Sequence, residues 1–217
     1  MSNNISWTYK KSGRNTSNVI SVLAVMLAIG SVAVDQLCGE QKACRWLPIA
    51  GFDDPSMASY ASTYVNYDYE FKVSIPTGLI GHSSPPPAPN HGFGILLGQR
   101  GEGYVWVDGS ANSLEYKSSE MAARNKIELL KDRGAIISES RMNRSRLGGF
   151  TATRLTVWYH CPDSQEMFVN EQVLALSPDK SPIWVVGLDT KQSRYEKDRR
   201  VFESILKSWE YNPFPQK

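Results

Sequence analysis

The sequence predicts an α+β domain in which a mainly antiparallel sheet of about six or seven strands is covered by two helices, as an α/β/α sandwich. Short runs of alternating apolar and polar residues, typical of half-buried strands, recur between residues 69 and 188. Two longer segments, 118–134 and 193–212, carry apolar residues at helical spacing instead. Turn residues separate these runs, which favours antiparallel neighbours.

Seven runs have the pattern of strands. The expected strands span residues 69–75, 92–98, 104–108, 135–141, 150–159, 167–176 and 183–188. Pro76-Thr77-Gly78 ends the first of them, and Gly148-Gly149 separates two of the last four. The spacing of the last four runs predicts an antiparallel meander.

The first helix is expected to begin at Ser118 or Ser119 and to end before Gly134. Serine caps the N-terminus of a helix through its hydroxyl group, and glycine favours the residue after the C-terminus. The apolar face consists of Ala123, Ile127 and Leu130.

The second helix is expected to begin with a capping box formed by Ser193 and Glu196, which stand three residues apart. Pro213 and Pro215 prevent the helix from continuing. Its apolar stripe consists of Tyr195, Phe202, Ile205, Leu206 and Trp209.

The N-terminus resembles a targeting segment. Residues 1–18 are polar and carry three basic and no acidic side chains, and residues 19–34 form an uncharged apolar run of 16 residues that Asp35 ends. This layout is typical of a signal peptide or a signal-anchor, with an apolar helix that contacts the membrane through 19–34 if it is not cleaved. We therefore expect a membrane-anchored or exported protein, in the periplasm or cell envelope if the source is bacterial.

The chain is accordingly divided into a targeting segment, 1–34, a tether, 35–67, and the α+β sandwich domain, 68–212. Proline, glycine, serine and asparagine punctuate the tether, and no strand or helix period persists there.

Cys38 and Cys44 lie six residues apart in the tether. In an oxidising compartment they would either close a small loop as a disulfide or remain two thiols. The third cysteine, Cys161, follows His160 directly, and neighbours in a strand point to opposite faces. Cys161 is therefore expected to be a spare thiol rather than a catalytic nucleophile.

The loop between the first two expected strands contains His82, His91 and the stiff run Pro85-Pro86-Pro87. A stiff, partly extended segment is suited to docking on a partner protein. The alternatives are a simple connector and a metal site in which the two histidines converge with Asp108, although their spacing matches no known ligand pattern.

Arg141, Arg144 and Arg146 lie within six residues of one another, near Gly148-Gly149. Alternate positions place Arg144 and Arg146 on one face of a strand. The cluster is a candidate site for an anion or an acidic partner, and the alternative is a solvated edge strand protected by charge.

Composition and motifs restrict the function. The net charge of +2 is nearly balanced, which gives no reason to expect nucleic acid as a partner. No G-x-S-x-G, G-x-G-x-x-G or H-E-x-x-H motif is present, so no catalytic, metal or cofactor site is assigned.

Two stretches resemble the PsbP-like family, named for the extrinsic photosystem II protein. They are Tyr69-Glu70-Phe71-Lys72-Val73-Ser74-Ile75-Pro76 and Phe202-Glu203-Ser204-Ile205-Leu206-Lys207-Ser208-Trp209. The order of elements between them agrees too, so the resemblance covers residues 69–211. It implies an α/β/α sandwich and the non-catalytic accessory role of many relatives. Leu79, where relatives often have tryptophan, and the long proline-rich loop depart from the family, and no functional residue is carried over.

The expected function is therefore that of a non-catalytic binding or accessory module with a protein partner, exported or tethered at the envelope. Two alternatives stay open: an envelope hydrolase that uses the His82/His91 loop, and an immunity-type protein that neutralises a toxin.

Overall fold

The computed structural model describes Cys44 and residues 58–83, 91–99, 101–162 and 164–213. The expected apolar helix at 19–34 lies outside these residues. Among the residues that are described, no helix is long and apolar enough to cross a bilayer.

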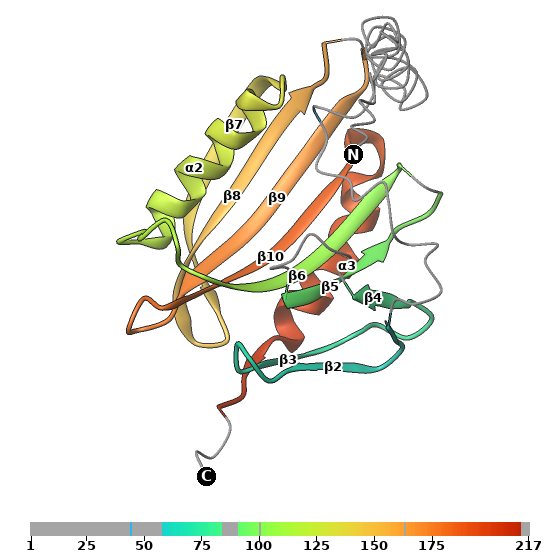
Figure 1. The fold of residues 1–217 in the computed structure, drawn as a ribbon. Helices are drawn as coiled ribbons and strands as arrows, with labels where there is room; N and C mark the ends of the chain where they lie inside the picture. The colour runs from blue at the N-terminus through green and yellow to red at the C-terminus, as the bar shows by residue number, and fades with distance from the viewer. Residues whose placement is uncertain (1–43, 45–57, 84–90, 100, 163, 214–217) are drawn as a thin grey trace, which may run out of the picture. The chain divides into compact units, whose positions relative to one another are not determined.

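The main element is an eight-stranded sheet in which all neighbouring strands are antiparallel (Figure 1). In spatial order its strands are β1 (Ser59–Tyr60), β4 (Gly81–Ser83), β5 (His91–Leu96), β6 (Gly103–Ala111), β10 (Pro182–Lys191), β9 (Met167–Leu176), β8 (Phe150–His160) and β7 (Ile136–Leu147).

A second, three-stranded sheet has the order β11 (Glu210–Tyr211), β3 (Phe71–Ser74) and β2 (Thr63–Asn66). The helices are α2 (Ser119–Asp132) and α3 (Tyr195–Ser208), and a short 3-10 turn, η1 (Gln192–Arg194), leads into α3.

The predicted fold class is confirmed: an antiparallel sheet and two helices form an α+β domain. The sheet is larger than predicted, however, and the strand expected at 69–75 is β3 of the small sheet. Residues 67–70 form a turn before it, in which Glu70 has a φ of 53°. Strands as short as β1 and β4 show too few alternations to be recognised in a sequence.

The two helices lie on opposite faces of the large sheet. Helix α2 packs on β7, β8 and β9, and its core includes Leu155 and Leu174. On the other face, α3 packs mainly on β10 and β6 and also contacts β3 of the small sheet, in a core that includes Trp184 and Phe202. On the face of the large sheet that carries α3, strands β7 and β8 therefore have no described helix packed over them.

Helix α2 agrees with the sequence prediction at both ends. The Met121 amide donates a 3.1 Å hydrogen bond to the Ser118 hydroxyl, and Gly134 follows the last turn with a φ of 85°. Ala123 and Leu130 are buried, so the predicted apolar face is the one that packs on the sheet.

The capping box predicted for the second helix is wrong. Arg194 occupies the N-cap position of α3, and no side chain caps the helix there. Arg194 instead pairs with Asp198 at 3.1 Å and with Glu102 at 2.7 Å, so that contacts with the β5–β6 turn hold this end of the helix. The predicted apolar stripe is confirmed in its buried members, because Phe202, Ile205 and Trp209 are all shielded from solvent.

Residues 58–67 correct the predicted tether. They contain β1 and β2, so they fold with the domain, and Tyr64 lies in its core. Apart from Cys44, the rest of the predicted tether lies outside the described residues.

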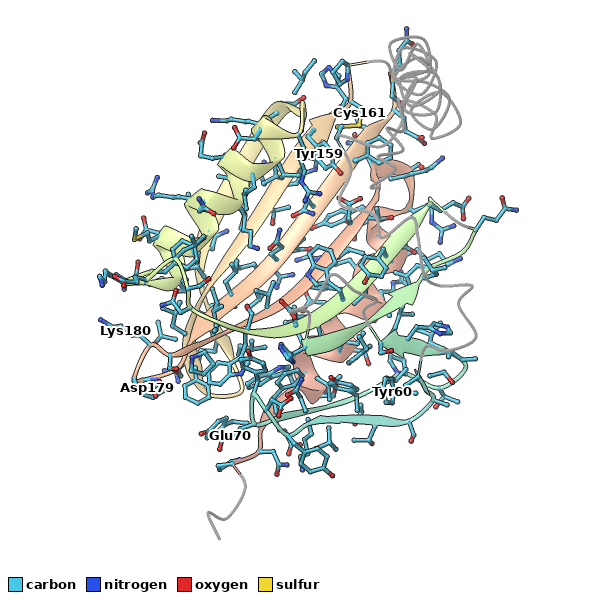
Figure 2. All side chains as sticks on the ribbon, in the orientation of Figure 1. Tyr60, Glu70, Tyr159, Cys161, Asp179 and Lys180 are labelled. Carbon is cyan, nitrogen blue, oxygen red and sulfur yellow. A yellow bond between two sulfur atoms is a disulfide. The ribbon has the colours of Figure 1, made fainter. Side chains whose placement is uncertain are left out.

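Cys38 and Cys44 were expected either to pair or to remain two thiols, and Cys161 was expected to be a spare thiol. The structure corrects the expectation for Cys161, because Cys161 forms a disulfide with Cys44. The two Cα atoms lie 5.5 Å apart although 117 positions separate them in the chain. Cys161 follows β8 at one end of the sheet, and Asp179 and Lys180 lie at the other end (Figure 2). Sequence spacing favours near neighbours, and only the folded sheet brings the start of the domain to this position.

Candidate functional site

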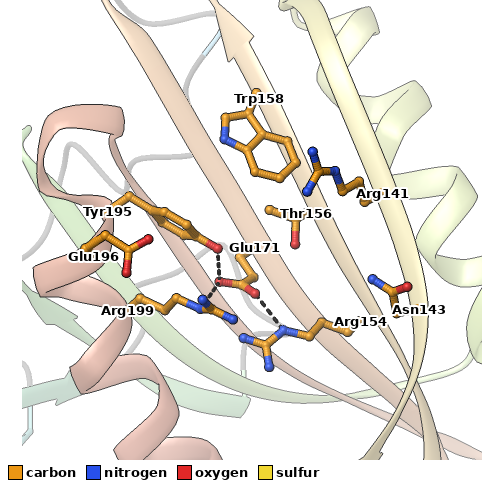
Figure 3. A pocket seen from close by; sticks show the side chains of 9 residues that line it. All are labelled: Arg141, Asn143, Arg154, Thr156, Trp158, Glu171, Tyr195, Glu196 and Arg199. Atoms are coloured by element: carbon orange, nitrogen blue, oxygen red, sulfur yellow. Dashed lines mark hydrogen bonds and ion pairs between the residues drawn. The ribbon is translucent and has the colours of Figure 1, made fainter.

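A pocket of about 400 Å³ opens on the face of β7 and β8 that α3 leaves uncovered, and it reaches β9 and the start of α3 (Figure 3). We call it the arginine pocket. Its lining consists of Arg141, Asn143, Arg154, Thr156, Trp158, Glu171, Tyr195, Glu196 and Arg199. Its volume falls within the range of sites that hold a small molecule or a group of partner side chains.

Strand alternation explains which residues face the pocket. In β8, Arg154, Thr156 and Trp158 line it, while Leu155 and Val157 between them enter the core under α2. The register continues this pattern into β7, where Arg141 stands opposite Thr156 and Asn143 opposite Arg154. The first two turns of α3 close the far side with Tyr195, Glu196 and Arg199.

A buried carboxylate, Glu171, lies at the base of the pocket. Its side chain is 1% exposed. It accepts hydrogen bonds from Arg154 Nε at 2.6 Å and from the Tyr195 hydroxyl at 2.8 Å, and Arg199 Nε lies 3.6 Å from it (Figure 3). A carboxylate is costly to bury unless it is paired and hydrogen-bonded, and these three side chains satisfy that requirement.

The same contacts fix the charge states around Glu171. Burial opposes the charge of Arg154, but hydrogen bonds to Glu203 and Glu171 raise the pKa of its guanidinium above the usual value. Burial and the neighbouring Glu171 carboxylate hold the pKa of Tyr195 above its ordinary range. Both groups therefore keep their protons at neutral pH, and Tyr195 remains a donor to Glu171.

The outer part of the pocket is aromatic and cationic. The Arg141 guanidinium lies 5.1 Å from the ring centroid of Trp158, and its Nε donates to Glu139 at 2.6 Å. Arg199 lies 5.7 Å from the ring of Tyr195, and within the described residues its Nε has no hydrogen-bond partner. An arginine has five N–H donors, so these contacts leave donors that a ligand can use.

The arrangement is suited to recognition. Its charged groups are held by one another in a network that spans two strands and a helix, and a preorganised network of this kind loses little side-chain entropy when a ligand binds. Arginine and tryptophan are also the side chains most enriched at the energetic centres of protein interfaces.

The histidines singled out in the sequence lie elsewhere. His82 is in β4 and His91 begins β5, and β6 and β10 separate these strands from the pocket-forming ones. The His91 ring contacts Tyr69 at 4.8 Å between centroids, and its Nδ1 lies 3.8 Å from Asp68. The run Pro85-Pro86-Pro87 lies outside the described residues.

His82, His91 and Asp108 were considered as a metal site, but the contact between His91 and Asp108 does not involve the imidazole ring. The His91 backbone N–H, rather than its imidazole ring, donates to Asp108 Oδ1 at 3.1 Å. In the described part of the chain, no three histidine, cysteine, aspartate or glutamate side chains are placed to hold a metal ion.

The three arginines of the predicted cluster are divided between the two faces of β7. Arg141 lines the pocket, whereas Arg144 stands opposite Thr153, whose hydroxyl contacts Ser119 of α2 on the other face. Arg146 shares the face of Arg144, as predicted, and donates to the Gly149 carbonyl at 3.1 Å.

The pocket contains five residues that no sequence motif predicted as site residues: Arg154, Trp158, Glu171, Tyr195 and Arg199. One signal was present: Asn170-Glu171-Gln172 is a polar interruption in a strand that is otherwise apolar and buried. A charged residue at the centre of such a strand needs a partner, but the partner's identity depends on the fold.

Comparisons with known proteins identify the fold. No protein-family model matches the chain, and no curated protein matches it in sequence. Among solved structures, the cyanobacterial PsbP of Synechocystis is similar, with a TM-score of 0.50 and 14% identity over 70% of this chain and 94% of that one. The predicted PsbP-like fold is therefore confirmed.

Two other solved structures have lower scores. The Ran-binding protein Mog1p of Saccharomyces cerevisiae is 12% identical over 73% of this chain and 97% of that chain, with a TM-score of 0.49. LpqN of Mycobacterium tuberculosis, involved in cell envelope biogenesis, is 12% identical over 75% of this chain and 88% of that chain, with a TM-score of 0.34. Similarity at this level of identity supports the fold alone, so any proposal about function depends on the site.

Proposed function

We propose that this protein is a non-catalytic binding module, exported or tethered at a membrane, whose partner protein contacts the arginine pocket. The observation that supports binding most strongly is the pocket itself: an open, polar and aromatic surface whose charged side chains are already fixed. A folded β-sheet face that presents arginines beside Trp158 has the composition of an interface centre.

Two independent features support export. The first is the basic, uncharged-apolar and acidic order of residues 1–35. The second is the disulfide between Cys44 and Cys161, because disulfides form and persist mainly in oxidising compartments such as the periplasm or the secretory lumen.

The binding proposal is tested by site-specific photocrosslinking in the native cell. A benzophenone side chain replaces Asn143, which is exposed and lines the pocket, and as a control it replaces Lys131, which is exposed on α2 at the opposite face. We expect a discrete partner adduct from position 143 alone, and we expect Trp158→Ala to remove it. Equal adducts from both positions, or an adduct that survives Trp158→Ala, would contradict the assignment of the site.

Export is tested separately by replacing Leu23 and Leu27 with arginine. An arginine at the centre of an apolar segment costs about 2.5–3.5 kcal/mol on insertion scales. We expect this variant to stay in the cytosolic fraction with Cys44 and Cys161 reduced, and unchanged fractionation would show that 19–34 does not direct export.

A further inference from the structure

Strand β7 forms an open edge of the large sheet. It pairs with β8 along its length, and no described strand lies on its other side. It has 12 residues, and most of their side chains are exposed. The outer edge of such a strand presents a row of backbone N–H and C=O groups that can pair with another chain.

The hairpin turn determines which backbone groups point outward. Gly148 and Gly149 have φ values of 54° and 93°, and the flanking Leu147 and Phe150 are partners in the register. In a two-residue turn of this type, the flanking residues share hydrogen bonds, and bonded and non-bonded pairs alternate from there. The residues with outward N–H and C=O groups are then Ser140, Met142, Arg144 and Arg146.

The charge of β7 indicates what this edge can accept. The strand contains three arginines and one acidic residue, Glu139. Arg141 lies on the pocket face, and Arg144 and Arg146 lie on the face of α2. A strand added to this edge would therefore meet positive charge on both of its faces, and opposite charges on neighbouring strands stabilise pairing.

We propose that the partner binds β7 through an extended acidic segment, which joins the sheet as an additional strand and pairs its carboxylates with Arg141, Arg144 and Arg146. This inference rests on the proposed binding function and specifies the class of partner and the mode of binding. Backbone hydrogen bonds to the outward groups supply the attraction common to all strand additions, and the arginines select acidic sequences.

The same charges disfavour a second copy of the chain as the occupant. Two antiparallel copies of β7 would bring arginines of both strands close together, and like charges on opposed strands are destabilising. The arginines thus oppose self-association while leaving the edge open to an acidic strand.

The first test measures hydrogen exchange of the full-length protein in detergent micelles by mass spectrometry. The probe is an eight-residue peptide of alternating glutamate and valine, and its control carries lysine in place of each glutamate. At a peptide concentration about ten times the Kd, the outward amides of β7 should exchange roughly tenfold more slowly with the glutamate peptide. The lysine peptide should leave their exchange unchanged.

The second test uses two variants of one outward residue. Arg144→Ala removes the charge and keeps the backbone N–H, whereas Arg144→Pro removes both, and an outward-facing N–H is the position where an edge strand tolerates proline. With folding of both verified by thermal unfolding, we expect Arg144→Pro to bind the glutamate peptide about threefold to tenfold more weakly than Arg144→Ala.

Three results would overturn the proposal: no slowing of exchange in β7, equal slowing by the lysine peptide, or equal binding by the alanine and proline variants. If amide exchange in β7 slows with increasing protein concentration in the absence of peptide, the edge pairs with a second copy of the chain. That result would also overturn the proposal. If photocrosslinking from Asn143 still captures a partner in any of these cases, the binding function stands and only the acidic strand addition fails.

Discussion

The substitution Trp209→Ala tests the packing that joins α3 and the small sheet to the large sheet. The Trp209 ring is 2% exposed. Its centroid lies 5.7 Å from that of Phe71 in a stacked arrangement and 5.5 Å from that of Trp184 in an edge arrangement. Truncation of a buried tryptophan costs about 3–5 kcal/mol, which for a domain of this size lowers the Tm by roughly 6–20 °C.

The matched variant Trp209→Phe separates the ring from its N–H group. The indole Nε1 is buried and has no hydrogen-bond partner among the described residues. A buried donor without a partner costs about 1–3 kcal/mol, so phenylalanine removes that cost while it retains an aromatic ring against Phe71. We expect its destabilisation to be less than about half that of Trp209→Ala.

Both variants are measured by thermal unfolding of the full-length protein, followed by circular dichroism. A Tm for Trp209→Ala within about 2 °C of the unsubstituted protein would refute the reasoning, because it would mean that the ring contributes less than about 1 kcal/mol. Equal losses in the two variants would show that the Nε1 atom has a partner.

Four further substitutions test other parts of the domain. Gly148→Ala should destabilise the fold by more than about 3 kcal/mol, because a Cβ at 148 overlaps the Trp209 ring. Gly149→Ala should cost only about 1 kcal/mol, because a Cβ at 149 has open space. Equal losses of stability in urea unfolding would contradict this. Burial raises the pKa of Asp108 to about 6, so the folded state holds this proton to higher pH than the unfolded state, and stability falls as pH rises from about 4 to 6. Asp108→Asn should therefore raise the free energy of unfolding by up to about 3 kcal/mol at pH 7 and flatten its dependence on pH. An unchanged pH dependence would exclude Asp108 as its source. Cys161→Ser should cost about 2–5 kcal/mol, and a reductant should then lower the Tm of the unsubstituted protein but not of the variant.

The physical features that the sequence predicted well depend on residues close together in the chain. The cap of α2 at Ser118 and its end at Gly134 are local hydrogen-bonding and backbone preferences. The apolar stripe of the last helix is a local periodicity, and it correctly located the buried side of α3. The resemblance to the PsbP-like fold also depends on local amphipathic patterns, in the strand at 69–76 and in the last helix, and the fold is confirmed.

The features that were mispredicted depend on a competition between local and distant contacts. A capping box at Ser193 and Glu196 satisfies the local pattern, but Arg194 binds Glu102, which lies 92 positions away, and fixes the end of the helix differently. Cys161, which was expected to be a spare thiol, similarly pairs with Cys44, 117 positions away. Sequence spacing favours partners that are close in the chain, whereas contacts in the folded protein form between residues that are close in space.

The sequence by itself determined the class of fold, the positions of both helices and the alternation that divides the arginines of β7 between two faces. Only the tertiary structure decided that α3 lies over β10 and β6 and leaves β7 and β8 uncovered, which creates the arginine pocket. Glu171 meets Arg154 and Tyr195 there because three elements converge, and no local periodicity encodes such a meeting. Propensity and period act over a few residues, but a binding site is assembled from side chains that only the packing of whole elements brings together.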